Sequence, residues 1–449
     1  MDAFIIHGQR PLRGEIQVNG SKNAALPLMT AALLTDAPVT LRSTPRLADI
    51  RNMARLLSEL GVDVSETPGA CGMRDLTLAS SDESRSHARY DIVRTMRASI
   101  SVLGPMLARR GYARVSMPGG CAIGDRPVDL HLRGLAALGA EIELESGDIV
   151  ARAPSGPAGP RLRGAKVFLG GPFGSTVLGT ANVMCAATLA TGRTIIESAA
   201  CEPEVVDLAT LLNAMGAEVR GAGTPRVIID GVDELTGADH TVMADRIEAG
   251  TYIMAAAITN GSMTIRNCPI DALMALTTSL AEVGVHCAAN EDEDPLRATV
   301  TVTSDRTLHP VQITTQPHPG FPTDLQAQMM ALLCHADGNS VVTERIFPQR
   351  FLHVAELSRM GAQLFRQGPT VIVSGVRELV GAPVMASDLR ASASLVLAGL
   401  AARGTTAIHR VYHLDRGYER MEEQLQALGA EIERVDAAEI PADLHPVGG

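Results

Sequence analysis

The feature that most constrains this fold is a short signature that recurs six times along the 449-residue chain. Each copy reads apolar residue, glycine, small or apolar residue, any residue, apolar residue. The glycines stand at positions 61, 139, 216, 284, 361 and 429, which gives spacings of 78, 77, 68, 77 and 68 residues. Helical apolar periodicity precedes each glycine and alternating residues follow it, so we expect a helix that ends at a left-handed glycine before a strand.

A second signature interleaves with the first. Alanine-rich helical segments are followed by Gly192, Gly261 and Gly404 and then by β-branched residues; Gly111 and Gly338 occupy matching places. In the first repeat the turn falls near residue 36. Each repeat is therefore predicted to be a βαβαββ-like α/β module. Helices this rich in alanine, methionine and leucine are expected to be buried on nearly all sides.

Length and composition restrict the class of protein. A chain of 449 residues exceeds what one hydrophobic core usually supports, so two domains are expected. No segment has the roughly eighteen consecutive apolar residues of a membrane helix, and the N-terminus lacks a signal-peptide pattern, which predicts a cytoplasmic protein with no membrane partner. A net charge of −11 argues against nucleic-acid binding. The seven cysteines form no C-x-x-C pair and are expected to be reduced, mostly buried, and no metal site is predicted.

Lys22 and Asn23 stand at the predicted start of an apolar helix, within residues 20–27. A helix N-terminus with a nearby ammonium can bind an anion. The alternative is a capped helix with an exposed lysine. Of the 39 lysines and arginines, only Lys22 and Lys166 are lysines. A lysine that persists in such a chain can be one that arginine cannot replace.

Cys121 lies in a segment with three glycines, residues 118–127, between a predicted strand and a predicted helix. Such a loop is suited to a moving lid. Arg126 close by favours the thiolate, so we interpret Cys121 as a reactive acid or nucleophile. An ordinary turn with an incidental cysteine is the alternative.

Charged residues beside turns and helix starts are further candidates. Arg97, Arg350, Arg390 and Arg416 lie in such places, although an isolated arginine is more often solvated. Asp324 opens a helix rich in alanine and methionine, where an acid is usually a cap. The chain has no P-loop, Rossmann glycine motif, H-E-x-x-H or G-x-S-x-G, so kinases, dehydrogenases, zinc peptidases and α/β-hydrolases lose their main support.

Taken together, the motifs resemble those of the UDP-N-acetylglucosamine 1-carboxyvinyltransferase family. The resemblance spans residues 3 to 435 and is carried by residues 20–27, 118–131, 321–328, 388–396 and 415–420. It implies two inside-out α/β barrel domains of three repeated units each. The first would cover residues 21–242 and the second residues 1–20 and 243–435, with a disordered tail at 436–449. The implied activity is the transfer of an enolpyruvyl group from phosphoenolpyruvate to UDP-N-acetylglucosamine, the first committed step of peptidoglycan synthesis and the target of fosfomycin, with no cofactor.

The resemblance also implies residue roles. Lys22, Arg126 and Arg416 would surround the phosphate of phosphoenolpyruvate, and Arg350 and Arg390 would hold its carboxylate. Asn23 and Asp324 would bind the sugar, with Asp324 taking the proton of the 3-hydroxyl and Asp388 assisting proton transfer on the other face. Cys121 would act on the enolpyruvate. Nucleotide and substrate contacts are implied for Arg97, Arg126, Pro127, Val128, Asp129, Leu130 and Ile346.

One stretch departs from the family pattern. Residues 171–180 stand where the family has a Ser-Val-Gly-Ala-Thr run, and this segment is one residue longer. If it still forms the uridine pocket, the glycines at 171, 174 and 179 must allow close backbone approach. An enolpyruvyl transferase with another nucleotide acceptor, or with shikimate 3-phosphate, and a catalytically silent relative that binds the nucleotide sugar, stay open as alternatives.

Overall fold

The computed structural model describes residues 2–69, 73–118, 128–157, 159–436, 438 and 440. The chain forms two compact units. The first unit contains the described residues from 20 to 243. The second unit contains residues 2–19 and the described residues from 244 onward. Each unit has its own hydrophobic core. The predicted tail, residues 436–449, begins with the last residue of a strand and, apart from 436, 438 and 440, lies outside the described residues.

Three four-stranded sheets belong to the first unit. Their strands, in spatial order, are β14 (Ala238–Thr241), β3 (Val39–Thr44), β5 (Arg74–Ser80) and β4 (Val62–Pro68); β6 (His87–Ala88), β7 (Tyr112–Ser116), β9 (Asp148–Arg152) and β8 (Glu141–Glu145); and β10 (Lys166–Phe168), β11 (Arg193–Glu197), β13 (Arg226–Asp230) and β12 (Glu218–Arg220).

The second unit likewise has three four-stranded sheets. Their strands, in spatial order, are β16 (Val285–Ala289), β17 (Ala298–Ser304), β15 (Ser262–Cys268) and β2 (Arg13–Gln17); β18 (Gln312–Thr314), β19 (Asn339–Thr343), β21 (Thr370–Ser374) and β20 (Gln363–Gln367); and β22 (Pro383–Met385), β23 (Thr405–His409), β1 (Asp2–His7) and β24 (Glu431–Asp436).

All six sheets share one pattern of pairing. One parallel pair, such as β10 with β11, is extended by two antiparallel strands. Three sheets complete this pattern with a strand from a distant part of the chain. β14 pairs in parallel with β3, β2 pairs in parallel with β15, and β1 lies between β23 and β24. The N-terminal strands therefore belong to the second unit.

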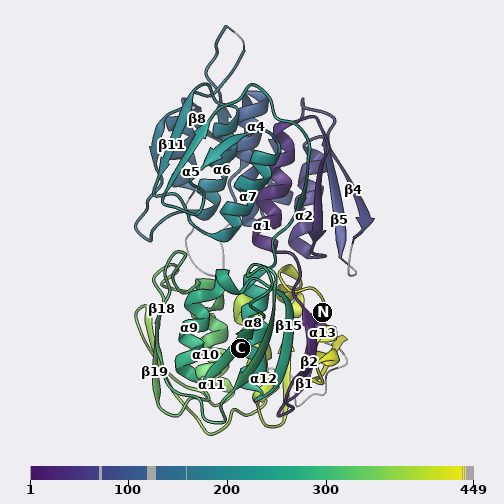
Figure 1. Ribbon diagram of the computed structural model, residues 1–449, viewed down its shortest axis with the longest axis vertical. Coiled ribbons are helices and arrows are strands. Elements are labelled where there is room, and N and C mark those ends of the chain that lie inside the picture. Colours follow the sequence, from purple (N-terminus) through teal and green to yellow (C-terminus); the bar gives the residue numbers. More distant parts are fainter. Residues whose placement is uncertain are drawn as a thin grey trace. The chain divides into compact units, whose positions relative to one another are not determined.

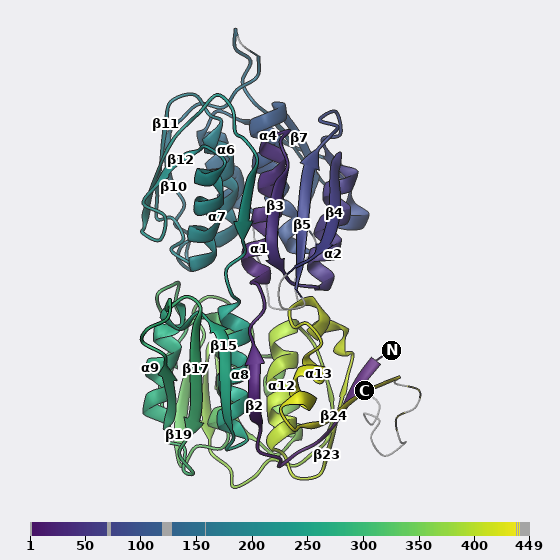
Figure 2. The ribbon, with the colours of Figure 1, turned by 45° about the vertical axis from the view of Figure 1, so that its right-hand side comes forward.

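Each repeat contributes a central helix, buried along nearly all of its length, and an outer helix, which keeps exposed positions. Figures 1 and 2 show strands along the outer faces of each unit. The central helices are α1 (Lys22–Ala31), α4 (Leu103–Arg110), α6 (Val177–Thr188), α8 (Arg246–Ile258), α10 (Gln326–Leu333) and α12 (Leu389–Ala401). The outer helices are α2 (Ala48–Glu59), α5 (Asp129–Ala137), α7 (Pro203–Ala214), α9 (Met274–Val283), α11 (Leu352–Arg359) and α13 (Met421–Ala427). Every residue of α8 is buried, which confirms the prediction of helices buried on all sides.

Six short helical segments complete the described part of the chain. They are η1 (Ala32–Leu34), α3 (Tyr90–Val93), η3 (Arg97–Val102), η4 (Ile270–Leu273), η5 (Thr323–Leu325) and η6 (Val411–Arg416). In the part of the chain that the structure describes, no helix is long and apolar enough to cross a membrane.

The six signature glycines adopt the predicted conformation. Their φ angles lie between 82° and 100°, and each stands between an outer helix and the strand that follows it. Gly216, for example, has φ of 100° between α7 and β12. Only glycine reaches this region without steric cost, so the signature marks a helix-to-strand turn in every repeat.

Candidate active site

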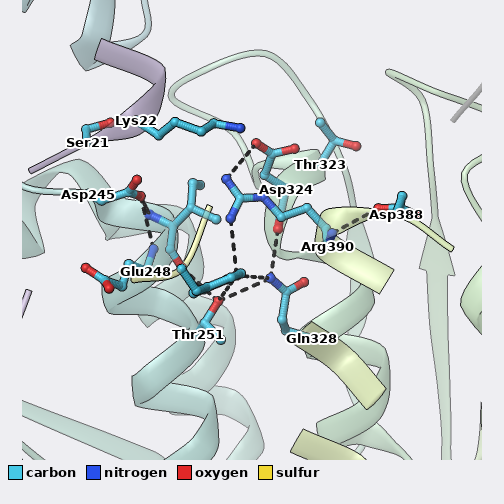
Figure 3. Close-up of polar contacts among 12 residues, drawn as sticks. Ser21, Lys22, Asp245, Glu248, Thr251, Thr323, Asp324, Gln328, Asp388 and Arg390 are labelled. Atoms are coloured by element: carbon cyan, nitrogen blue, oxygen red, sulfur yellow. Dashed lines mark hydrogen bonds and ion pairs between the residues drawn. The ribbon is translucent and has the colours of Figure 1, made fainter. Parts of the chain in front are cut away.

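Asp324 lies in η5 of the second unit, directly before α10, and is held by two arginines. Arg350 Nη1 lies 2.8 Å from Asp324 Oδ1, and Arg390 Nη2 lies 3.4 Å from Oδ2. The arginine side chains are only 7% and 3% exposed, whereas that of Asp324 is 27% exposed. Two nearly buried cations therefore favour the ionised carboxylate and contact its two oxygens separately. Figure 3 shows the contact between Asp324 and Arg390. Leu325, and not Asp324, occupies the N-cap position of α10.

Arg390 rests on a buried network of polar side chains. Its Nη1 donates to Tyr418 Oη at 3.2 Å, and Tyr418 contacts Thr251 Oγ1 at 2.9 Å. Thr251 donates its own proton to Ile247 O, so the Tyr418 hydroxyl must donate to Thr251. Gln328 Nε2 joins the network through Thr251, Tyr418 and the Asp324 carbonyl. Burial opposes the charge of Arg390, but Tyr418 and Asp324 outweigh it and raise its pKa.

Asp388 caps the helix that carries Arg390. Its Oδ1 accepts from the backbone nitrogens of Arg390 at 2.9 Å and Ala391 at 3.2 Å (Figure 3). Burial lowers the pKa of His353 to about 4 and also lowers the pKa of His413, against a smaller opposing effect of Asp388 on each. Both imidazoles are therefore neutral at pH 7.

Arg416 is the last residue of η6, and Arg434 binds the residue before it, Asp415. Arg434 donates to both carboxylate oxygens of Asp415, at 3.1 and 2.6 Å. Ile346 follows β19 in the loop that leads to Arg350, and its nitrogen donates to Glu344 at 2.8 Å. Of the predicted site residues in the second unit, Asp324 is the one that forms ion pairs with both Arg350 and Arg390.

Lys22 and Asn23 begin α1 of the first unit. Ser21 Oγ caps this helix by accepting from the nitrogen of Ala24 at 3.3 Å. The Lys22 side chain is 12% exposed and its Nζ lies 3.5 Å from Asp49 Oδ2. The helix is capped, as one alternative required, but the lysine is largely buried. Lys166, in contrast, is 67% exposed and pairs with Glu197 at the surface.

Arg97 and residues 128–130 lie at two further helix starts of the first unit. Arg97 opens η3 and is half-buried, and buried Val128 precedes α5, which begins at Asp129. Both segments are tied to Asn182 of α6, whose Nδ2 donates to Ile100 O at 2.9 Å and contacts His131 Nδ1 at 3.0 Å. One amide therefore fixes two of the predicted substrate-binding segments.

The segment that departs from the family pattern forms a tight turn followed by α6. Gly171 and Gly174 exchange backbone hydrogen bonds of 2.8 and 3.2 Å. A Cβ at Gly171 would lie 3.1 Å from Leu130 Cδ1, so the turn packs closely against the start of α5. Phe173 at its tip is 58% exposed. Gly171 is thus tightly packed within the chain, and the approach of its backbone to a uridine stays a prediction.

Cys121, Arg126 and Pro127 lie outside the described residues, as does Cys71. The other five cysteines are free thiols. Burial raises the pKa of each, to about 12 for Cys185, Cys268 and Cys334 and to about 11 for Cys287, with a smaller rise for Cys201. These five agree with the prediction of reduced, mostly buried cysteines, and a raised pKa disfavours the reactive thiolate.

Sequence reasoning did not find the residues that support Asp324 and Arg390. Gln328, Thr251 and Tyr418 lie inside helical or turn patterns that read as ordinary core. Glu344, which is fully buried, follows a β-branched strand without any motif around it. Of these, only Gln328 and Tyr418 fall within the recognised motifs, and their type alone gave no sign of a buried network.

Comparison with known proteins places the chain in a family. The family model for EPSP synthase (3-phosphoshikimate 1-carboxyvinyltransferase) matches residues 6–425. The UDP-N-acetylglucosamine 1-carboxyvinyltransferase of Dinoroseobacter shibae is 54% identical over 435 residues, which cover 97% of this chain and 99% of the relative. That of Anaeromyxobacter sp. (strain Fw109-5) is 51% identical over 437 residues, covering 97% and 100%. The chain belongs to the UDP-N-acetylglucosamine 1-carboxyvinyltransferase family.

Solved structures agree with this assignment at the level of the fold. The enolpyruvyl transferase NikO from Streptomyces tendae has a TM-score of 0.85 at 24% identity, covering 97% of this chain and 99% of its own. EPSP synthase from Acinetobacter baumannii has a TM-score of 0.74 at 18% identity, covering 97% and 100%. The carboxyvinyltransferase family resemblance predicted from sequence is therefore confirmed, and the chain is an enzyme of the enolpyruvyl transferase class with a two-domain α/β fold.

Proposed function

We propose that this chain transfers the enolpyruvyl group of phosphoenolpyruvate to the 3-hydroxyl of UDP-N-acetylglucosamine and releases phosphate. The observation that carries the proposal is the Asp324 carboxylate held by Arg350 and Arg390 in a chain 49–54% identical to proteins that bear this activity in their names. The reaction needs a base for a hydroxyl proton and cations for a substrate that carries a carboxylate and a phosphate, and this arrangement offers both.

In the proposed mechanism, the sugar's 3-oxygen attacks C2 of phosphoenolpyruvate while Asp324 takes the hydroxyl proton and C3 receives a proton. The tetrahedral ketal then loses a proton from C3 and phosphate from C2, which restores the double bond. Arg350 and Arg390 would bind the substrate carboxylate. Because the substrate carboxylate would share the N–H donors of the two arginines with Asp324, binding of phosphoenolpyruvate would make Asp324 a stronger base.

The remaining roles follow the family pattern. Lys22, Arg126 and Arg416 would bind the phosphate, and Asn23 the sugar. Asp388 would assist proton transfer, although its capping bonds leave only part of its carboxylate for that task. Cys121 would act as an acid or nucleophile at the enolpyruvate.

Nucleotide contacts are proposed for the first unit. Arg97 and residues 126–130 would contact the nucleotide, with Ile346 as a further substrate contact from the second unit. The fixed starts of η3 and α5, both tied to Asn182, support the first of these assignments. We also propose that residues 21–242 form one inside-out α/β barrel domain and residues 1–20 with 243–435 the other. The buried central helices support this description.

In the cell this activity would be the first committed step of peptidoglycan synthesis, in the cytoplasm, and hence bear on cell shape and division. Phosphate release from phosphoenolpyruvate tests the proposal, with UDP-N-acetylglucosamine, UMP and shikimate 3-phosphate as parallel acceptors. We expect release with UDP-N-acetylglucosamine alone. Release only with UMP or shikimate 3-phosphate would assign the departure at residues 171–180 to another acceptor, and binding of UDP-N-acetylglucosamine without release would make the chain a silent relative.

A further inference from the structure

The carboxylate of Glu344 lies behind the Asp324–Arg350 pair and joins the two loops that carry it. Glu344 directly follows β19 and is fully buried. Its Oε1 accepts from the backbone nitrogens of Ile346 at 2.8 Å and Phe347 at 2.9 Å, in the loop that leads to Arg350. The remaining two hydrogen bonds come from the loop that leads to Asp324.

Those two bonds come from threonine hydroxyls. Thr315 Oγ1 donates to Glu344 Oε1 at 2.6 Å, and Thr323 Oγ1 donates to Oε2 at 2.9 Å. Among the described residues the buried carboxyl thus has four donors, and none of them is a cationic side chain. A movement of either loop would leave a buried oxygen without its donors, so the two loops are fixed relative to each other.

The hydroxyl of Thr323 has a defined polarity. Arg350 Nη1 donates to Thr323 Oγ1 at 3.0 Å, and a guanidinium can only donate. The threonine proton is therefore directed to Glu344. The same Nη1 also reaches Asp324 Oδ1 at 2.8 Å. Glu344, Thr323, Arg350 and Asp324 form one continuous chain of hydrogen bonds.

Within its own loop, Arg350 makes two further contacts, both with Phe347. Its backbone nitrogen donates to Phe347 O at 2.9 Å, and its Cζ lies 5.8 Å from the centre of the Phe347 ring. Phe347 is itself held through its backbone nitrogen by Glu344. The backbone of Arg350 is thus connected to the Glu344 carboxyl through Phe347, and its side chain through Thr323.

We propose that Glu344 is a positioning residue for the transfer reaction, which directs the Arg350 guanidinium against Asp324 through the hydroxyl of Thr323. Glu344 touches neither substrate nor the reacting atoms in this scheme. Its effect is on the direction of one guanidinium and, through it, on the basicity of Asp324. The kinetic part of the test rests on the proposed function, and the structural part does not.

The kinetic test compares Glu344→Gln and four further variants with the wild type in the phosphate-release assay. Thr323→Val removes the connecting hydroxyl with little change in shape, and Thr323→Ser restores it. Thr315→Val removes the other hydroxyl bound to Glu344, and among the described residues Arg350 bonds to Thr323 and not to Thr315. Glu197→Gln makes the same carboxylate-to-amide change as Glu344→Gln at a surface ion pair. We expect kcat to fall more than tenfold in Glu344→Gln and Thr323→Val and less than threefold in the other three.

Two further readouts separate positioning from a general loss of structure. In Thr323→Val the acid limb of the pH dependence of kcat/KM should move to higher pH, because a carboxylate with a weaker cationic partner holds its proton more tightly. Glu344→Gln and Thr323→Val should be non-additive in kcat, since they interrupt the same chain of bonds. Equal loss in Thr315→Val and Thr323→Val, with no movement of the limb, would overturn the proposal.

Crystal structures of Glu344→Gln and Thr323→Val decide the question without turnover. The account predicts that the Arg350 guanidinium leaves its 2.8 Å contact with Asp324 in both variants. An unchanged contact overturns it. If the wild type shows no phosphate release, the proposed function fails while these structures still test the positioning of Arg350.

Discussion

The buried carboxyl of Glu248 should make the second unit lose stability as the pH rises above 6. Glu248 lies in the first turn of α8, where its two oxygens accept from the backbone nitrogen of Asn19 at 2.7 Å and its side-chain nitrogen at 3.0 Å. Burial, helped by the nearby charge of Asp245, raises its pKa from 4.5 to about 8, against the opposing hydrogen bonds of Asn19. The native state therefore holds a proton that the unfolded chain releases near pH 4.5.

The sign and size follow from this difference. A carboxyl with a raised pKa contributes stability that is fully present below pH 4.5 and is lost as the pH rises through about 8. Between pH 6 and 8 the loss is about 2 kcal/mol, since each unit of pH below the native pKa is worth about 1.4 kcal/mol. Glu248→Gln cannot titrate, and its amide can still pair with Asn19 after a rotation of either group.

Urea unfolding followed by circular dichroism at pH 6, 7 and 8 measures the effect. The free energy of unfolding of the wild type should fall relative to that of Glu248→Gln by about 2 kcal/mol over this range. Glu197→Gln is the control, because Arg226 lowers the pKa of Glu197 and keeps it ionised throughout. Parallel curves for the wild type and Glu248→Gln would refute the reasoning.

Three other predictions follow from the same structure and family pattern. Asp324→Asn should lower kcat by about a hundredfold or more with little change in KM for the sugar nucleotide, because the amide keeps the shape but cannot accept the hydroxyl proton; steady-state kinetics within threefold of the wild type would contradict this. Fosfomycin should modify Cys121 alone, as mapped by mass spectrometry, and Cys121→Asp should stay active and resistant; an adduct at Cys185 or Cys334, whose thiols have a pKa of about 12, would exclude it. Gly216→Ala should cost about 1–2 kcal/mol in urea unfolding through backbone strain alone, since φ is 100° and no atom lies within 4 Å of an added Cβ, and a neutral substitution would show that the turn can relax.

The repeat architecture could be predicted because each turn depends on one local property. A glycine with φ between 82° and 100° after an apolar helix leaves a mark in the sequence that no other residue replaces cheaply. The pairing of strands from distant parts of the chain could not be predicted from the repeats alone. β14, β2 and β1 pair with strands far along the chain, and their own sequences do not record which partner they join.

Of the residues that the structure joins around Asp324, sequence patterns indicated those that carry a charge at a turn or helix start. Asp324, Arg350 and Arg390 were singled out for that reason, and the structure joins them. Glu344, Thr251 and Tyr418 were missed because a buried polar residue is defined by partners from other segments, which single-sequence patterns do not contain. Asp388 turned out to cap α12, a local role that the family comparison had not implied.

The identity of the product tests the central claim most directly. The wild-type enzyme is incubated with phosphoenolpyruvate and UDP-N-acetylglucosamine, and the product is analysed by mass spectrometry and proton NMR. The account predicts one phosphate released for each sugar nucleotide converted, and an enol ether on the 3-oxygen of the sugar. No enol ether from UDP-N-acetylglucosamine, together with carboxyvinyl transfer to shikimate 3-phosphate under the same conditions, would contradict it.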